Sequence, residues 1–159
     1  MSAQLHDADF YTWTQQQADH LRAGRLDALD ALHLIEELES MGARERRELE
    51  TRLSILLQHL LKWRYQPERR GSSWRNTIKV QRIDAGRVLA DNPGLTPKLP
   101  ELFEAAYERA RLLAAADTGK EESDFPERPP LTFDQAMSPD YWPEDQNPES
   151  VNPEPARRA

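Results

Sequence analysis

The chain has 159 residues, a formal net charge of −7 and no cysteine. This length suits one domain with room for a tail. The lack of cysteine excludes disulfides, thiolate metal sites and cysteine nucleophiles. No apolar run approaches the roughly 20 residues that span a bilayer, which excludes a membrane-spanning helix. The first ten residues lack the basic region and apolar stretch of a signal peptide, so we expect a cytoplasmic protein.

The apolar residues favour helices over strands. Leucine and alanine dominate them, against three valines and four isoleucines. Leucine and alanine enter a helix at little cost, whereas β-branched residues suit a sheet. No segment alternates apolar and polar residues for long enough to indicate a half-buried strand. The composition therefore predicts an all-α fold.

The charge is arranged in blocks along the chain. Residues 1–43 have a net charge of −6, residues 44–82 of +7, residues 83–119 of −2 and residues 120–159 of −6. The whole molecule is expected to repel nucleic acid at long range, while its middle third can attract an anion locally. The opposite blocks can also neutralise each other within the fold, which we favour.

Two helices are predicted in the first 43 residues. The first covers about residues 8–23, with Asp7 or Asp9 near its start and Gly24 at its end. The second begins near Asp27 or Asp30 and ends around Gly42. The side chains expected to point inward are Phe10, Trp13, Ala18 and Leu21 on the first helix, and Leu34, Ile35, Leu38 and Met41 on the second.

A third helix, predicted for about residues 43–65, has the strongest apolar pattern. Its apolar residues are spaced by four, three, four and three: Leu49, Leu53, Leu56, Leu60 and Trp63. Leu57 and Leu61 widen this stripe into a face that suits a globular bundle. Burying each leucine is worth about 1.5–3 kcal/mol, so we expect this helix to form the centre of the core.

Two further helices are predicted before residue 120. Ser72 or Ser73 is the expected N-cap of the fourth, which ends at Asn92–Gly94. The fifth begins near Pro100, where a missing N–H costs little, and Gly119 ends it. The expected inner faces are Trp74, Ile78, Ala85, Val88 and Leu89 on the fourth helix, and Leu102, Phe103, Ala106, Ala110 and Leu113 on the fifth.

The C-terminal forty residues have a different composition. They hold eight of the twelve prolines and ten acidic residues. We expect Phe125 and Leu131 to pack on the bundle and Thr132 to cap a short helical turn. The prediction is a compact bundle of about five helices over residues 1–137 and a proline-rich, acidic and largely disordered tail over 138–159. Tyr141 and Trp142 either dock on the domain or form a short binding motif.

Five stretches together resemble a known family. They are Asp9–Trp13, Leu34–Gly42, Glu45–Leu53, His59–Pro67 and Ser73–Ile78. In this order and spacing they resemble the bacterial family of the domain of unknown function DUF29, over about residues 7–136. The resemblance implies a compact helical fold and no particular activity, cofactor or ligand. Small bacterial proteins of this kind have been linked to toxin–antitoxin modules, so an antitoxin-like or accessory role is a weak expectation.

Residues 62–75 mix basic, aromatic and hydroxyl side chains at a helix end, a loop and a helix start. The candidate binding residues are Lys62, Arg64, Tyr65, Arg69, Arg70, Ser73 and Arg75. Such a set can hold a phosphate or carboxylate at a helix N-terminus, or stack on unpaired nucleic-acid bases. The favoured alternative is structural: Trp63 and Trp74 lie in the core, and the arginines pair with acids at positions 36, 37 and 39.

Arg52 and His59 form a catalytic candidate. Six residues lie between them, a spacing similar to that of helical ribonucleases of the HEPN type, in which four to six residues lie between an arginine and a histidine. A guanidinium and an imidazole on one helix face can stabilise phosphate charge and transfer a proton. Leu53 departs from that pattern, which usually has a polar residue there, and Glu48 is a ready partner for Arg52. We therefore keep a metal-independent ribonuclease as an alternative only.

Asp30, His33 and Glu37 are a candidate metal set, because they share one helical face. The helical di-metal pattern needs a Glu-x-x-His motif on facing helices, and none of the four histidines has a glutamate three residues before it. His6 and His20 offer no clear companions. A solvated acidic face is favoured, so no metal or other cofactor is predicted.

The sequence therefore favours a non-enzymatic module that binds an unidentified protein partner. Binding of nucleic acid or another anion through residues 62–75 is an alternative that predicts affinity falling steeply with salt.

Overall fold

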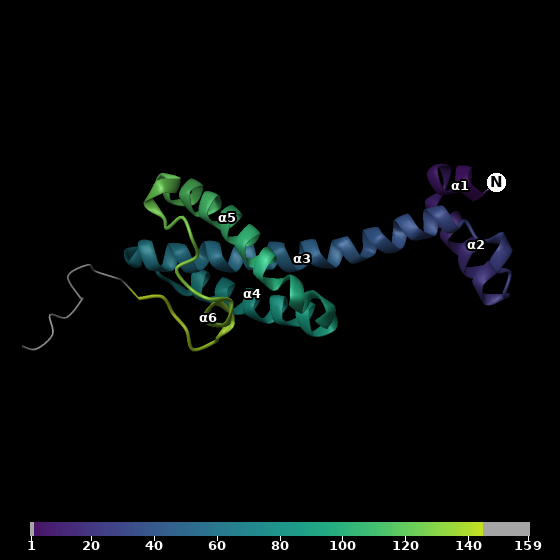
Figure 1. The fold of residues 1–159 in the computed structure, drawn as a ribbon. Helices are drawn as coiled ribbons and strands as arrows, with labels where there is room; N and C mark the ends of the chain where they lie inside the picture. The colour runs from purple at the N-terminus through teal and green to yellow at the C-terminus, as the bar shows by residue number, and fades with distance from the viewer. Residues whose placement is uncertain (1, 145–159) are drawn as a thin grey trace, which may run out of the picture. The chain divides into compact units, whose positions relative to one another are not determined.

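The computed structural model describes residues 2–144, with side chains from Gln4 onward. The described chain is all-α, as predicted, and contains no strand (Figure 1). Its helices are α1 (Ser2–Ala8), α2 (Phe10–Arg22), α3 (Ala31–Tyr65), α4 (Ser72–Asp91), α5 (Leu99–Thr118) and α6 (Phe133–Met137). The contacts divide the chain into an N-terminal unit, residues 1–45, and a C-terminal unit from residue 46 onward.

No helix within residues 2–144 combines the length and the apolar character needed to cross a membrane.

The N-terminal unit begins with two helices where one was predicted. Asp9 separates α1 from α2: its backbone leaves the helical region, and its carboxylate accepts a hydrogen bond from Thr12 N at 3.0 Å. Asp9 is therefore the N-cap of α2, one of the two residues expected in that role. Gly24 adopts the left-handed conformation (φ +72°) just after α2, as its predicted role requires.

Helix α3 continues through Gly42, so the predicted break between the second and third helices is wrong. A glycine inside a helix costs only about 1 kcal/mol relative to alanine. The residues on both sides, from Glu36 to Glu50, are mostly strong helix formers with no proline among them. Their combined preference outweighs the cost of the one glycine, and a single helix runs from Ala31 to Tyr65.

We predict that Gly42→Ala raises the free energy of unfolding of the N-terminal unit by about 0.5–1 kcal/mol. A Cβ at this position has nothing within 4 Å, and the backbone there is helical. The matched control is Gly24→Ala, which forces a side chain into a left-handed backbone and should destabilise. Thermal unfolding followed by circular dichroism compares the two. A loss of stability in Gly42→Ala would contradict a continuous α3.

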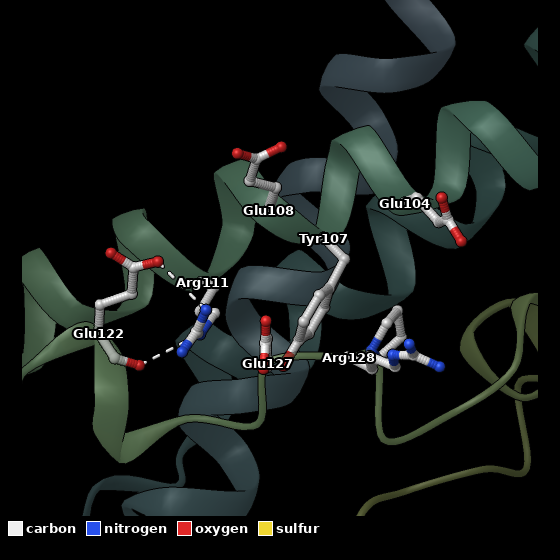
Figure 2. Close-up of a pocket in the computed structure, with 8 residues that line it drawn as sticks. Glu104, Tyr107, Glu108, Arg111, Glu122, Glu127 and Arg128 are labelled. Carbon is white, nitrogen blue, oxygen red and sulfur yellow. Dashed lines mark hydrogen bonds and ion pairs between the residues drawn. The ribbon is translucent and has the colours of Figure 1, made fainter.

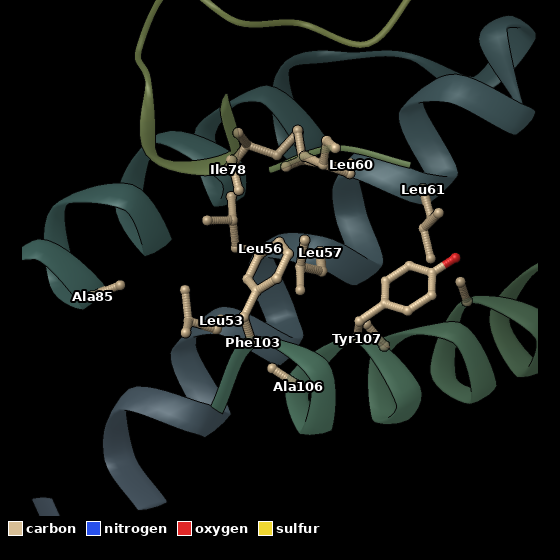
Figure 3. Packing of buried hydrophobic residues seen from close by; sticks show 14 of the residues in the cluster. Leu53, Leu56, Leu57, Leu60, Leu61, Ile78, Ala85, Phe103, Ala106 and Tyr107 are labelled. Atoms are coloured by element: carbon tan, nitrogen blue, oxygen red, sulfur yellow. The ribbon is translucent and has the colours of Figure 1, made fainter. Parts of the chain in front are cut away.

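The core of the C-terminal unit is built on the predicted stripe of α3. Leu53, Leu56 and Leu57 are completely buried, and Leu49, Leu60, Leu61 and Trp63 are nearly so. Figure 3 shows these side chains meeting residues of α4 and α5, among them Ile78 and Phe103. The prediction that this stripe forms the centre of the core is confirmed.

Helices α4 and α5 have nearly the predicted bounds. Gly71, rather than Ser72 or Ser73, is the N-cap of α4, because the helix already begins at Ser72. Pro100 occupies the first turn of α5, and Gly119 (φ +68°) follows its last residue. Of the expected inner positions, the fully buried ones are Ile78 and Ala85 on α4, and Ala106 and Ala110 on α5.

The chain after α5 packs back on the C-terminal unit. Phe125 and Leu131 are buried, as expected, and Thr132 caps α6 by accepting a hydrogen bond from Gln135 N. Trp142 lies against Trp63, with ring centroids 4.8 Å apart. Tyr141 and Trp142 thus dock on the domain, which is the first of the two alternatives given for them. Residues 145–159 of the predicted tail lie outside the described residues.

Candidate functional site

The N-terminal unit exposes many large apolar side chains. Eight of the described residues of this kind lie there: Phe10, Tyr11, Leu21, Leu26, Leu32, Ile35, Leu38 and Met41. The prediction that Phe10, Leu21, Ile35, Leu38 and Met41 point inward is therefore wrong, since each of these side chains is between 49% and 66% exposed. The helical pattern was real, but the unit supplies too few residues to cover the apolar faces of both helices.

A groove of about 440 Å³ runs between α2 and the first part of α3. Its lining is mostly apolar: Phe10, Trp13, Ala18, Leu21, Leu34, Leu38 and Met41, with Thr14, Gln17, Glu37 and Arg44. On α3, Leu34, Leu38 and Met41 are spaced by four and three, which places them in one stripe. We call this feature the hairpin groove.

Polar contacts fix the two helices that form the groove. Trp13 is 2% exposed, and its Nε1 donates to Asp30 Oδ2 at 3.0 Å. The backbone N–H of Asp30 donates to Gln17 Oε1 at 2.8 Å. Asp30 directly precedes α3, so α2 holds the start of α3 in place. Desolvation acts to raise the pKa of the Asp30 carboxyl, but the hydrogen bonds from His33 and Trp13 outweigh it and hold that pKa below its usual value.

His6 and His33 stack beside the groove, with ring centroids 4.0 Å apart. His6 Nε2 lies 2.7 Å from Glu37 Oε1, and its Nδ1 lies 2.9 Å from Asp7 Oδ1. The bond to Glu37, and then that to Asp7, raises the pKa of His6. The sequence identified His33, Asp30 and Glu37 but found no role for His6, since the helix α1 that carries His6 was not predicted.

The predicted binding residues 62–75 take part in the packing of the C-terminal unit. Lys62 is buried, its Nζ lies 3.1 Å from Asp117 Oδ2, and it also contacts the face of Trp74. Arg70 Nε donates to the carbonyl of Trp63, and Arg70 and Arg75 both lie over the Trp63 ring.

The remaining members of this set are more exposed. Arg64 lies over the ring of Tyr65, which itself contacts Phe125. Arg69 and Ser73 are exposed, and the Ser73 carbonyl accepts from Thr77 Oγ1. Much of the set thus has a structural role, and anion or nucleic-acid binding here stays a prediction.

Arg52 and His59 are both engaged within the C-terminal unit. Arg52 Nε donates to Glu48 at 2.8 Å, as the sequence suggested, and Nη1 lies 3.6 Å from Asp84. His59 Nδ1 contacts the carbonyl of Ile55 at 2.9 Å, and burial lowers the pKa of this histidine. Glu48 and Asp84 thus already neutralise the Arg52 guanidinium, which would have to bind the phosphate in a ribonuclease. The ribonuclease alternative stays a prediction.

A cavity of about 560 Å³ lies beside α5 in the C-terminal unit (Figure 2). It is lined by Glu104, Tyr107, Glu108, Arg111, Glu122, Glu127, Arg128 and Pro129. Arg111 binds the carbonyl and carboxylate of Glu122, and Tyr107 Oη donates to the carbonyl of Pro126. Burial raises the pKa of Tyr107 to about 12. These contacts fasten the segment after α5 and make the cavity chiefly structural.

The comparisons with known proteins give one match. The model of the family described as "Domain of unknown function DUF29" matches residues 5–142, nearly all of the described chain. No curated protein and no solved structure matches the sequence.

Proposed function

This chain belongs to the DUF29 family, and we propose that it is a non-enzymatic module that binds an amphipathic helix of a partner protein in the hairpin groove. The observation that carries the proposal is the exposure of an ordered apolar stripe on α3. Leu38 and Met41 are more than half exposed although they line a groove. Contiguous exposed apolar surface commonly marks an interaction site.

A helix fits this groove better than an extended peptide does. The groove walls are themselves two helices, and the exposed residues of α3 repeat with helical spacing. Helix-in-groove recognition places apolar residues of the ligand at positions i, i+3 or i+4, and i+7. The N-terminal unit exposes no sheet edge that could pair with an extended strand, since it contains only helices among its described residues.

The charge of the unit favours a basic partner. Residues 1–45 hold nine acidic and three basic residues, and Glu37 lies in the groove wall. A helix with lysine or arginine on its solvent-facing side would be attracted at long range and bound more tightly at low salt. The same charge disfavours a second copy of this unit, because two such units would repel each other.

The test is binding of a designed probe peptide to the full chain. The probe is a fluorescent peptide of about 18 residues, or five helical turns, with leucines at helical spacing and lysines elsewhere. We expect it to bind the wild type, and Leu38→Asp to weaken binding by at least about tenfold, which corresponds to 1.4 kcal/mol. The loss follows from placing a charge in an apolar contact.

The matched control is Leu112→Asp, which alters a side chain that is 49% exposed on α5 in the C-terminal unit. This variant should bind the probe as the wild type does. A second peptide with glutamates in place of the lysines should bind more weakly. Failure of the lysine peptide to bind the wild type at about 100 µM, or an equal loss in both variants, would refute the proposal.

We place this module in the bacterial cytoplasm. The family resemblance supports a bacterial source, and the lack of cysteine is compatible with a reducing compartment. An antitoxin-like or accessory role fits a module that acts by holding a partner helix.

A further inference from the structure

Two helices of the N-terminal unit bring metal-binding side chains together. His6 and Asp7 come from the last turn of α1, and His33 comes from the first turn of α3. One ligand atom from each of these three residues lies within 4.8 Å of the other two. Nitrogen from histidine and oxygen from a carboxylate are ligands that Zn²⁺ accepts, and three protein ligands leave a position for water.

Each histidine has a carboxylate partner outside the set of three ligands. His33 Nδ1 donates to Asp30 Oδ2 at 2.7 Å, and Asp30 is itself fixed by Trp13 Nε1. His6 Nε2 lies 2.7 Å from Glu37 Oε1. Such carboxylate–histidine pairs orient the ligands of zinc sites from the outer shell. Nε2 of His33 and Nδ1 of His6 are then the metal-facing atoms.

Two of these ligands lie slightly closer together than they would around a zinc ion. His6 Nδ1 and Asp7 Oδ1 are 2.9 Å apart, whereas two tetrahedral ligands at 2.0–2.1 Å from a zinc ion lie about 3.3 Å apart. The ligand atom of His33, which lies within 4.8 Å of the other two, must move closer to them to bind the same ion. Because a ring nitrogen binds a metal in the plane of its ring, one of the two stacked rings must also turn.

The surroundings favour a cation. The ligand cluster and its outer shell contain three carboxylates: Asp7, Asp30 and Glu37. The side chains of His6 and His33 are 13% and 21% exposed, which keeps them partly shielded while Asp7 remains open to solvent. A divalent ion can therefore reach the site from the Asp7 side, and it would replace the direct hydrogen bond between His6 and Asp7 by metal–ligand bonds.

We propose that His6, Asp7 and His33 form a binding site for a divalent transition-metal ion of the zinc type, which fastens α1 to the start of α3. Asp30 and Glu37 orient the two imidazoles. None of the three ligand residues lines the hairpin groove, so variants of His6 and His33 test the metal site separately from the peptide-binding proposal; of the outer shell, Glu37 does line the groove.

The experiment titrates the metal-free full chain with ZnCl2 and follows the heat of binding and the side-chain NMR signals of the histidines. We expect one ion per chain, with the signals of His6 and His33 shifting together. His6→Ala and His33→Ala should weaken zinc binding by at least about a hundredfold, and the outer-shell variant Glu37→Gln by about 10–100-fold. Co²⁺ in place of Zn²⁺ should give the intense visible absorption of a tetrahedral ion.

His20→Ala and His59→Ala are the matched controls, because they remove the other two histidines of the chain and should leave zinc binding unchanged. Asp7→Asn tests the third ligand without a risk of misfolding, because the side chain is exposed and keeps its size. This variant should also weaken zinc binding. The proposal is overturned if the wild type takes up no zinc at about 100 µM, or if His6→Ala and His33→Ala bind zinc as the wild type does. It is also overturned if a control variant loses the ion.

Discussion

Replacing Leu56 by alanine is expected to lower the free energy of unfolding of the C-terminal unit by about 2–5 kcal/mol. Leu56 has no exposed surface and lies in the middle of the apolar stripe of α3 (Figure 3). The change removes buried methyl groups and leaves a cavity that neighbours on α4 and α5 close only in part. Urea unfolding followed by circular dichroism and by tryptophan fluorescence measures the loss.

Leu112→Ala is the matched control for this experiment. It makes the same substitution in a helix of the same unit, but Leu112 is 49% exposed. A surface substitution of this kind usually changes stability by less than about 0.5 kcal/mol. If both variants unfold at the urea concentration of the wild type, the α3 stripe cannot be the core that the structure shows.

The core of the C-terminal unit was predictable because its pattern is strong and local. The apolar residues from Leu49 to Trp63 recur every three or four positions, and this spacing places them on one face of a helix. All seven apolar positions predicted on this stripe are buried. Gly119 and Thr132 were predictable for a similar reason: a left-handed glycine and a capping hydroxyl act on their own neighbours.

The N-terminal unit was predicted less well, because its features depend on competing preferences and on distant partners. Gly42 marked a helix end by local rules, yet the helix formers around it carry α3 through. The stripe from Leu34 to Met41 is helical as predicted, but periodicity does not reveal whether a second layer covers it. Within the N-terminal unit, no described segment covers this stripe, so the hairpin groove is open.

The candidate metal residues show the same limit. Asp30, His33 and Glu37 lie within one helix face and could be grouped from the sequence. His6 is more than twenty residues away, and its position depends on the turn at Asp9. Helix α1, which carries His6, was not predicted, so the partner of His33 was missed. Among residues 62–75, by contrast, the sequence correctly favoured a core position for Trp63.

Arg82 is predicted to hold the last described segment in place. It is a buried side chain of α4, and burial lowers the pKa of its guanidinium. Its Nε donates to the carbonyl of Ala136 at 2.8 Å, and its Nη2 donates to the carbonyl of Tyr141 at 2.6 Å. The guanidinium also lies over the ring of Trp142. One side chain therefore joins α6 and the docked aromatic pair to α4.

We expect Arg82→Met to lower the free energy of unfolding of the C-terminal unit by about 2–4 kcal/mol, because it leaves the buried carbonyl of Ala136 and the partly buried carbonyl of Tyr141 without donors. Hydrogen exchange should rise first in residues 133–144, and limited proteolysis should cut there. Arg82→Lys should restore little of the loss, since one ammonium cannot reproduce the fork of donors that reaches both carbonyls.

Arg87→Met on the same helix is the matched control, because Arg87 is exposed and its loss should leave both measurements unchanged. The docked segment also covers Trp63, so its release in Arg82→Met should expose that ring and shift the tryptophan emission to longer wavelength. An Arg82→Met protein with wild-type exchange in residues 133–144 would show that the segment is held by its apolar contacts alone. Phe133, Ala136 and Trp142 would then anchor it without the guanidinium.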